Sequence, residues 1–371
     1  VDAHSEAFAE QDLSLNIGAH IELDLQQETL SASRLTVNTQ QQQVAGQFVL
    51  KSFTKPRIDF SLHADKLDLD KLIFLAPSDS AEPTSENIEL PVDVLRSLEL
   101  FGDVSIGALH TSGLVMTDVE GKVFAQQGVL KIDPLRMDIY QGQYSGSAQL
   151  DVSGSIPHYH AISDLQKLAI SDLLQALSDN NKSFIRGQSS LSFNIKTEGK
   201  SVSDLKKQLN GTLAFNAMDG ALQSENLARN IEYVMAFLKG RTPKPSGQEI
   251  IFDSFAATGV IKHGVFTNDD LMLSTPLLSA TGAGQVDIPS SSIAYTLGVG
   301  LSPDSDTQLP IQIEGPLSKP KYSVDIKSAM SGQQKQKLED KKQEIQEKLL
   351  DGVGEKLGDD VKKKLKKLKL F

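Results

Sequence analysis

The stretch "YSGSAQLDVSGSIPHYHAISDLQKLAISDLL" (residues 144–174) repeats the layout of an earlier stretch, "VAGQFVLKSFTKPRIDFSLHADKLDLDKLI" (residues 44–73). Gly46 and Leu50 correspond to Gly146 and Leu150, and both stretches end on a similar leucine-rich segment. One inserted residue between the leucine and the following proline aligns the remainder. Glycines within alternating apolar residues mark bends or bulges, and a proline marks a strand edge or start. The sequence therefore predicts a strand–turn–strand–helix unit that occurs twice.

Alternation with period two extends well beyond this repeat. In "LNIGAHIELDL" (residues 15–25) the apolar residues share one parity, which predicts a strand with one apolar face. Helical spacing occurs at residues 167–180 and 224–240, where Ser224 is a candidate N-cap. The apolar-parity residues that we expect to share one face are Val104, Ile106, Leu135, Met137, Ile139, Leu150, Val152, Leu191, Phe193, Ile195, Leu213, Phe215, Leu297, Val299 and Leu301.

Two architectures satisfy such one-sided strands. A second sheet or a layer of helices would cover the apolar side and form a sandwich core. Alternatively, a long curved antiparallel sheet built of repeats would leave its inner face open as an apolar groove, with a few short helices and a C-terminal amphipathic helical tail. Periodicity does not distinguish them, although the scarcity of helices and large aromatic residues favours the groove. The expected divisions are residues 1–75 (upstream repeat), 76–89 (flexible linker), 90–327 (β-rich domain) and 328–371 (tail).

Composition excludes several classes of function. The chain has 371 residues, a net charge of −11, 6% aromatic residues and no tryptophan, so nucleic acid is not an expected partner. Cysteine is absent, which rules out disulfides and thiolate sites. His158 and His160 share one face of an extended segment, but no clustered carboxylate accompanies them, so polar strand residues are the preferred interpretation over metal ligands. We expect no catalytic residues, no metal, no cofactor and no enzyme activity.

The C-terminal segment "VKKKLKKLKLF" (residues 361–371) differs from the rest of the chain. Its six lysines carry +6, so the remainder of the chain carries −17. Apolar residues at helical spacing among lysines are typical of a helix on an anionic membrane surface. A solvated terminus, or binding to another acidic partner, remains open. The expected membrane-surface residues are Lys362, Lys363, Lys364, Leu365, Lys366, Lys367, Leu368 and Lys369.

Residues 90–152, "LPVDVLRSLELFGDVSIGALHTSGLVMTDVEGKVFAQQGVLKIDPLRMDIYQGQYSGSAQLDV", resemble the C-terminal region of the AsmA family. Later segments up to about residue 326 fit the family's pattern in the same order. One departure is "SENLA" at residues 224–228, where the family usually has a sequence closer to Gly-x-Asn-Leu. The matching positions are Pro91–Leu95, Gly107–Leu109, Gly128–Leu135, and Tyr140 with Gly142 and Gly146.

The resemblance implies a periplasmic protein of Gram-negative bacteria that serves outer-membrane biogenesis. Family members have an N-terminal transmembrane helix in the inner membrane, and we expect that anchor to lie outside this chain. The family's relation to bridge-like lipid carriers implies passive passage of phospholipids between the two membranes along the apolar groove. The alternative is a structural or chaperone-like module whose exposed sheet edges bind outer-membrane proteins during assembly.

Overall fold

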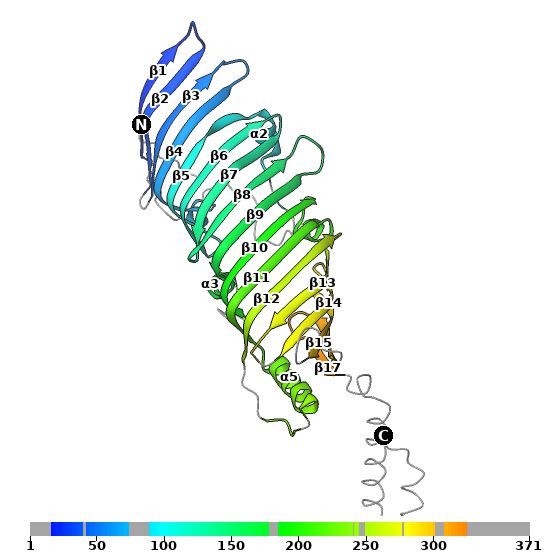
Figure 1. The fold of residues 1–371 in the computed structure, drawn as a ribbon. Coiled ribbons are helices and arrows are strands. Elements are labelled where there is room, and N and C mark those ends of the chain that lie inside the picture. The colour runs from blue at the N-terminus through cyan, green and yellow to red at the C-terminus, as the bar shows by residue number, and fades with distance from the viewer. Residues whose placement is uncertain are drawn as a thin grey trace, which may run out of the picture.

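We describe the fold from a computed structural model, which defines residues 16–39, 42–73, 88, 90–177, 185–239, 241–244, 249–276, 278–300 and 308–324. These residues form one 17-stranded sheet, long and curved, which runs the length of the molecule (Figure 1). Each strand pairs with its neighbours in the sequence. Among the described strands, only β4 and β5 pair in parallel.

The strands succeed one another along the sheet in chain order. They are β1 (Asn16–Asp24), β2 (Thr29–Asn38), β3 (Gln43–Lys51), β4 (Arg57–Asp68), β5 (Glu99–Thr111), β6 (Leu114–Gln126), β7 (Val129–Ile139), β8 (Gly142–Asp151), β9 (His158–Ala169), β10 (Ile185–Glu198), β11 (Asn210–Gln223), β12 (Glu249–Lys262), β13 (Val265–Ser274), β14 (Ser279–Asp287), β15 (Ser292–Gly300), β16 (Leu309–Pro316) and β17 (Lys321–Val324).

Five described helices sit at the two rims where the strands end. We call the rim at the ends of β4, β9 and β11 the α3 rim, and the opposite rim the α2 rim. The α3 rim carries α1 (Leu69–Ile73), α3 (Ile170–Leu177) and α5 (Glu225–Leu238). The α2 rim carries α2 (Val92–Ser97) and α4 (Val202–Lys207). In Figure 1, α2 lies at the right-hand side of the sheet and α3 at the left.

The duplicated unit is present as predicted. The earlier copy is β3–β4–α1 and the later copy is β8–β9–α3. Pro56 and Pro157 each directly precede the second strand of their copy, where a missing backbone N–H costs no ladder bond. The copies differ in how the second strand pairs with its successor, because β4 pairs in parallel with β5 whereas β9 pairs antiparallel with β10.

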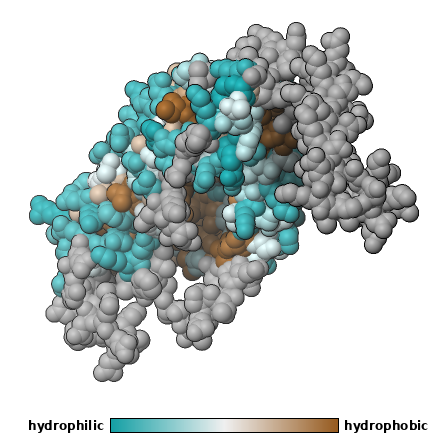
Figure 2. Space-filling view, turned by 90° about the horizontal axis from the view of Figure 1, so that it is seen from below, coloured by the Kyte–Doolittle hydropathy of each residue, from teal (hydrophilic) through white to brown (hydrophobic). Residues whose placement is uncertain are grey.

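The single sheet confirms the open architecture over the sandwich. No second sheet covers the apolar face in the described part of the chain. Figure 2 shows hydrophobic side chains gathered in a recess between hydrophilic walls. The linker at 76–89 falls almost entirely outside the described residues, as does the tail at 328–371. The strands on either side of that linker pair directly, from Arg57 opposite Glu99 to Asp68 opposite His110, and the division into domains stays a prediction.

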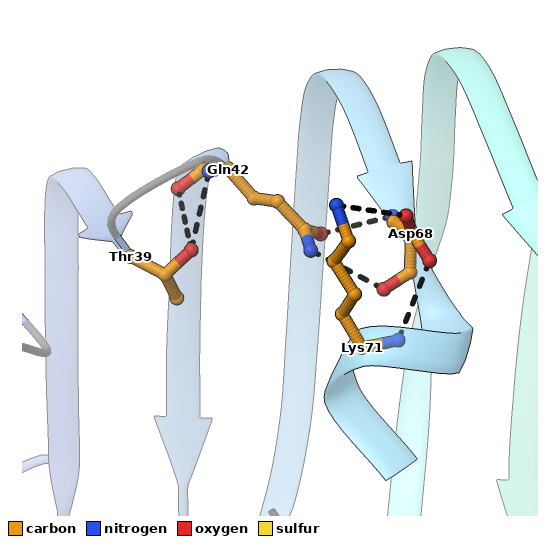
Figure 3. A network of polar contacts seen from close by, with 4 residues as sticks. All are labelled: Thr39, Gln42, Asp68 and Lys71. Carbon is orange, nitrogen blue, oxygen red and sulfur yellow. Dashed lines mark hydrogen bonds and ion pairs between the residues drawn. The ribbon is translucent and has the colours of Figure 1, made fainter. Parts of the chain in front are cut away.

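Turns at the α3 rim are tied by side chains as well as by the ladder. The Gln42 side chain donates to the Asp68 carbonyl at 3.2 Å and accepts from the Asp68 N–H at 2.9 Å (Figure 3). Thr39 Oγ1 accepts from the Gln42 N–H, and the Asp68 carboxylate accepts from the N–H of Lys71 in α1. The Gln42 side chain thus satisfies both backbone groups of Asp68, as a neighbouring strand would. It holds the β2–β3 turn and the start of α1 together.

Aromatic rings of the apolar face lie over glycines on adjacent strands. A methyl group added to Gly102 would lie 2.6 Å from Cγ of Phe60, which is closer than real carbon contacts allow. The missing side chain at Gly102 therefore leaves the space that the Phe60 ring occupies. This packing of an aromatic ring against a glycine on the adjacent strand occurs at Phe60 opposite Gly102, Phe252 opposite Gly220 and Tyr295 opposite Gly284.

We expect Gly102→Ala to lower the free energy of unfolding by roughly 1–3 kcal/mol, because the new methyl group would lie 2.2 Å from the Phe60 carbonyl oxygen and 2.6 Å from its ring, so both must shift. Gly154→Ala is the matched control, since a methyl group there would come no closer than 4.0 Å to the Ile156 carbonyl oxygen. Urea unfolding followed by circular dichroism measures both. Equal stability of the two variants would show that the Phe60 ring does not need the glycine.

Candidate functional site

The candidate site is the apolar inner face of the curved sheet. Strand registers place the predicted groove residues on this one face, except Val152, which follows the end of β8 and has no register partner, and Leu301, which lies outside the described residues. For example, Leu191 lies opposite Leu165 on one side and opposite Phe215 on the other. Leu150 lies opposite Leu130 in the same way. The face is therefore continuous from strand to strand, as alternation predicted.

Exposure of this face changes along the length of the sheet. At the β1 end, Ile17 and Ile21 are 54% and 63% exposed. In the middle strands, residues such as Phe193 and Leu213 are half-buried. At the far end, Val299 and Ile311 are both 0% exposed. The face is thus open at one end and a packed core at the other.

Helix α5 contributes to the packed end. Its apolar stripe includes Ala228, Ile231, Val234 and Met235, which belong to the same buried cluster as Phe252 and the inner residues of β15 and β16. Figure 1 shows α5 at the end of the sheet beside β15 and β17. Its N-terminus begins as predicted, with the Ser224 hydroxyl accepting from the Leu227 N–H at 3.3 Å.

An ion pair ties the segment that follows α5 to the helix. Both guanidinium nitrogens of Arg241 donate to the Glu232 carboxylate, at 2.6 and 3.0 Å, and the Lys244 N–H donates to it at 2.7 Å. The hydrogen bonds from Arg241, followed by the one from Lys244, lower the pKa of Glu232 to about 2. The carboxylate is therefore ionised throughout the physiological range and holds the segment after α5 against the helix.

Polar groups on the inner face are mostly paired with each other. The hydroxyls of Tyr144 and Ser163 are 2.9 Å apart, and the Tyr295 hydroxyl donates to the Asn268 side chain. Burial, with smaller contributions from Asp270 and Asp269, raises the pKa of Tyr295 to about 12. These pairs leave few free donors or acceptors on the face.

Two further tyrosine hydroxyls lack such a partner. Tyr140 and Tyr159 carry buried hydroxyls with no hydrogen bond among the described residues. Burial alone raises the pKa of Tyr159, so its hydroxyl stays protonated. Each is therefore a buried polar group whose hydrogen bond is not made within the described residues.

The opposite, outer face is polar and carries the two histidines. His158 Nδ1 lies 3.0 Å from a carboxylate oxygen of Glu198, and His160 Nε2 lies 2.9 Å from the Asn194 side-chain oxygen. No cluster that could hold a metal ion occurs in the described ranges. Both histidines lie on β9 and face outward, each beside a polar side chain of β10.

Sequence alternation missed several inner-face residues because bulges interrupt the period of two. Met116 and Val119 are both buried although they are three positions apart, an odd spacing that regular alternation would place on opposite faces. Asp118 between them has a φ of 49°, and the register shifts between Thr117 and Glu120. A bulge of this kind re-aims the following side chain to the same face. Residues with a left-handed backbone conformation interrupt the apolar–polar alternation of the strands at Arg34, Asp118, Lys167 and Asp219.

The described helices are too short or too polar to cross a bilayer. The basic residues 362–369 lie outside the described residues, so their contact with a membrane surface stays a prediction.

A comparison with protein families matches residues 2–271 to the model of the AsmA family. The chain belongs to the AsmA family. The match starts upstream of β1 and ends within β13, so it covers more of the N-terminal strands than the sequence motifs did. Protein AsmA of Escherichia coli (strain K12) is 21% identical over 369 residues, which cover 91% of this chain and 59% of that protein. This AsmA-family chain therefore spans less than two thirds of its relative, and no solved structure matches it.

We expect Glu232→Gln to speed hydrogen exchange of the α5 amides roughly three- to tenfold at pH 7, since it removes the charge that Arg241 pairs with. A lowered carboxyl pKa stabilises the fold above the ordinary value of 4.5 and loses that effect as pH falls towards about 2. The ratio of exchange rates between variant and wild type should therefore approach one in acid. Glu225→Gln, at the start of the same helix, is the control and should leave exchange near Arg241 unchanged.

Proposed function

We propose that this AsmA-family chain carries the acyl chains of phospholipids along its inner face, as part of a passive route between the inner and outer membranes. The continuous apolar face of a single sheet, with no second sheet opposite it among the described residues, carries the proposal. A monomeric protein rarely exposes a large contiguous apolar surface unless something binds there. The family membership supports an envelope function in the periplasm.

The free energy involved is large enough to make such a surface useful. A phospholipid has roughly 30 methylene groups, and exposing each to water costs about 0.8 kcal/mol, or more than 20 kcal/mol in total. A continuous apolar surface removes most of that barrier without a chemical step. Headgroups would remain in water at the rims, so the route needs few specific polar residues and no catalytic group.

We expect Ile195→Asp to reduce bound phospholipid several-fold, because an ionised carboxylate on the inner face is costly beside acyl chains. Ile195 lies on the inner face of β10. Ile162→Asp on neighbouring β9 is the matched control, since Ile162 faces outward and is 42% exposed. Native mass spectrometry of each purified full chain measures lipid occupancy, with circular dichroism to show that both remain folded. Equal occupancy in two folded variants would reject the inner face as the lipid path.

The exposed edge strand β1 supports a second function, a chaperone-like module that binds strands of outer-membrane proteins. All nine residues of β1 are exposed. An edge strand with no neighbour on its other side among the described strands offers backbone donors and acceptors to another strand. By contrast, β17 is short and follows Pro316 and Pro320.

Photo-crosslinking amino acids separate the two functions. We expect a crosslinker at Phe193 to give phospholipid adducts in cells and one at Ile21 to give few protein adducts. Abundant adducts with outer-membrane proteins at Ile21, without lipid adducts at Phe193, would favour the chaperone-like module. His160, on the outer face, is the position for a background control.

A further inference from the structure

Helix α5 belongs to a segment that leaves the sheet and returns to it at one point. β11 ends at Gln223 and β12 begins at Glu249, and these two residues lie opposite each other in the ladder. The Gln223 side chain donates to the Glu249 carboxylate at 3.3 Å, and the Arg186 guanidinium of β10 donates to it at 2.7 Å. The strand ends at the base of this segment are therefore joined without the helix, and a displacement of α5 breaks no hydrogen bond of the ladder.

Apolar contacts hold α5 to the strands. In the described part of the chain, every hydrogen bond and ion pair of the helix stays within residues 224–244. The Glu232 carboxylate, which binds Arg241 and the Lys244 N–H, ties the end of this segment to the helix. The buried side chains of α5 include Ala228, Ile231, Val234 and Met235. Residues 224–244 can therefore lift from the sheet as one unit without leaving a buried polar group unpaired.

The surface next to α5 continues the open part of the inner face. The rings of Phe215 and Phe255 meet edge to face with centroids 5.5 Å apart, and those of Phe255 and Phe252 with centroids 6.0 Å apart. Phe215 and Phe255 are half-buried, whereas Phe252 is 1% exposed. Helix α5 packs against β12, which carries Phe252, and its buried residues share one cluster with Phe252, Val299 and Ile311. The row of rings therefore leads from the open section of the face into the section that α5 covers.

We propose that residues 224–244 form a lid that closes a further acyl-chain section of the inner face, an inference that rests on the lipid route proposed above. Lifting α5 in water would expose the apolar surfaces of both the helix and the sheet, which is unfavourable. An acyl chain that moves past Phe255 and enters between them covers both surfaces again. The lipid therefore binds the lifted state better than the closed state, and this difference in affinity shifts the lid.

The chemistry on the two sides of the lid identifies the occupant. The helix side consists of alanine, isoleucine, valine and methionine, and the sheet side includes Phe252, Val299 and Ile311. No charged side chain is buried in the part of the chain that the structure describes. A polar ligand or a peptide backbone would lose hydrogen bonds with water in such surroundings, whereas an acyl chain has none to lose. The section under the lid thus extends the proposed route, and its closure keeps apolar surface from water when no lipid is bound.

Spin labels on pairs of introduced cysteines test the lid in the full chain, which has no cysteine of its own. Tyr233 of α5, Val115 of β6 and Ile251 of β12 are 49%, 41% and 64% exposed, so labels there leave the packing in place. We expect the label distance in Val115→Cys/Tyr233→Cys to change by roughly 4 Å or more, one carbon contact distance, when diheptanoyl phosphatidylcholine is added below its micelle concentration. Val115→Cys/Ile251→Cys is the matched control and should keep its distance, because both positions belong to the sheet. Pulsed electron paramagnetic resonance measures both distances.

Native mass spectrometry of the same samples counts the bound phospholipid and separates the lid from the lipid route. Bound lipid with an unchanged distance to position 233 would overturn the lid and leave the route standing. An equal change in the two variants would also overturn the lid, since the sheet itself would then have moved. Absence of bound lipid would reject the route and the lid together.

A photo-crosslinking amino acid at Phe252 supplies the second measurement. We expect phospholipid adducts at Phe252, fewer than at Phe193 on the open section. Val234 is 0% exposed, so Val234→Ala weakens the packing of α5 and should raise the adducts at Phe252 roughly two- to fivefold while those at Phe193 stay unchanged. Tyr233→Ala, on the exposed side of α5, is the matched control and should change neither. Adducts at Phe193 with none at Phe252, or equal Phe252 adducts in the two variants, would overturn the lid.

Discussion

The structure depends on one constraint: a sheet that satisfies its backbone hydrogen bonds from β1 to β17 while burying apolar side chains on one face only. Strands spaced by about 4.8 Å leave no edge free inside the ladder, so backbone pairing gives no reason to close the inner face. The side chains do give a reason, because exposed apolar surface is costly. The rings of Phe60, Phe252 and Tyr295 pack against Gly102, Gly220 and Gly284, and these contacts reduce that cost.

Alternation predicted the face but not its surroundings. The parity of Leu150 and Ile195 in the sequence is the parity of the structure, and the helices at 167–180 and 224–240 appear as α3 and α5. An open sheet and a sandwich share a period of two, so only the three-dimensional arrangement separates them. The helices α1, α2 and α4 have five or six residues each, too few for helical periodicity to appear. Bulges at Asp118 and Lys167 shift the alternation by one residue. A strict period of two therefore does not place Val119 and Leu168 on the inner face, where the structure has them.

The two ends of the sheet are physically different. Ile17 and Ile21 at the β1 end are exposed, whereas Leu297 and Val299 at the other end pack in the same cluster as α5. Residues that alternation grouped together therefore have two roles: some border open space, and others form a core that anchors the last strands. An occupant of the inner face would meet open space near β1 and packed side chains towards β15. The two ends therefore offer such an occupant different amounts of room.

Transport along a surface also requires that no position binds too tightly. On the inner face, Tyr144 bonds to Ser163 and Tyr295 to Asn268, so these polar groups are already satisfied and offer an ester or phosphate little net gain. Apart from the unpartnered hydroxyls of Tyr140 and Tyr159, such a face would be nearly uniform for an acyl chain. On the lipid route that we propose, thermal motion would then suffice along an inner face built largely from leucine, isoleucine, valine and phenylalanine, without a chemical step.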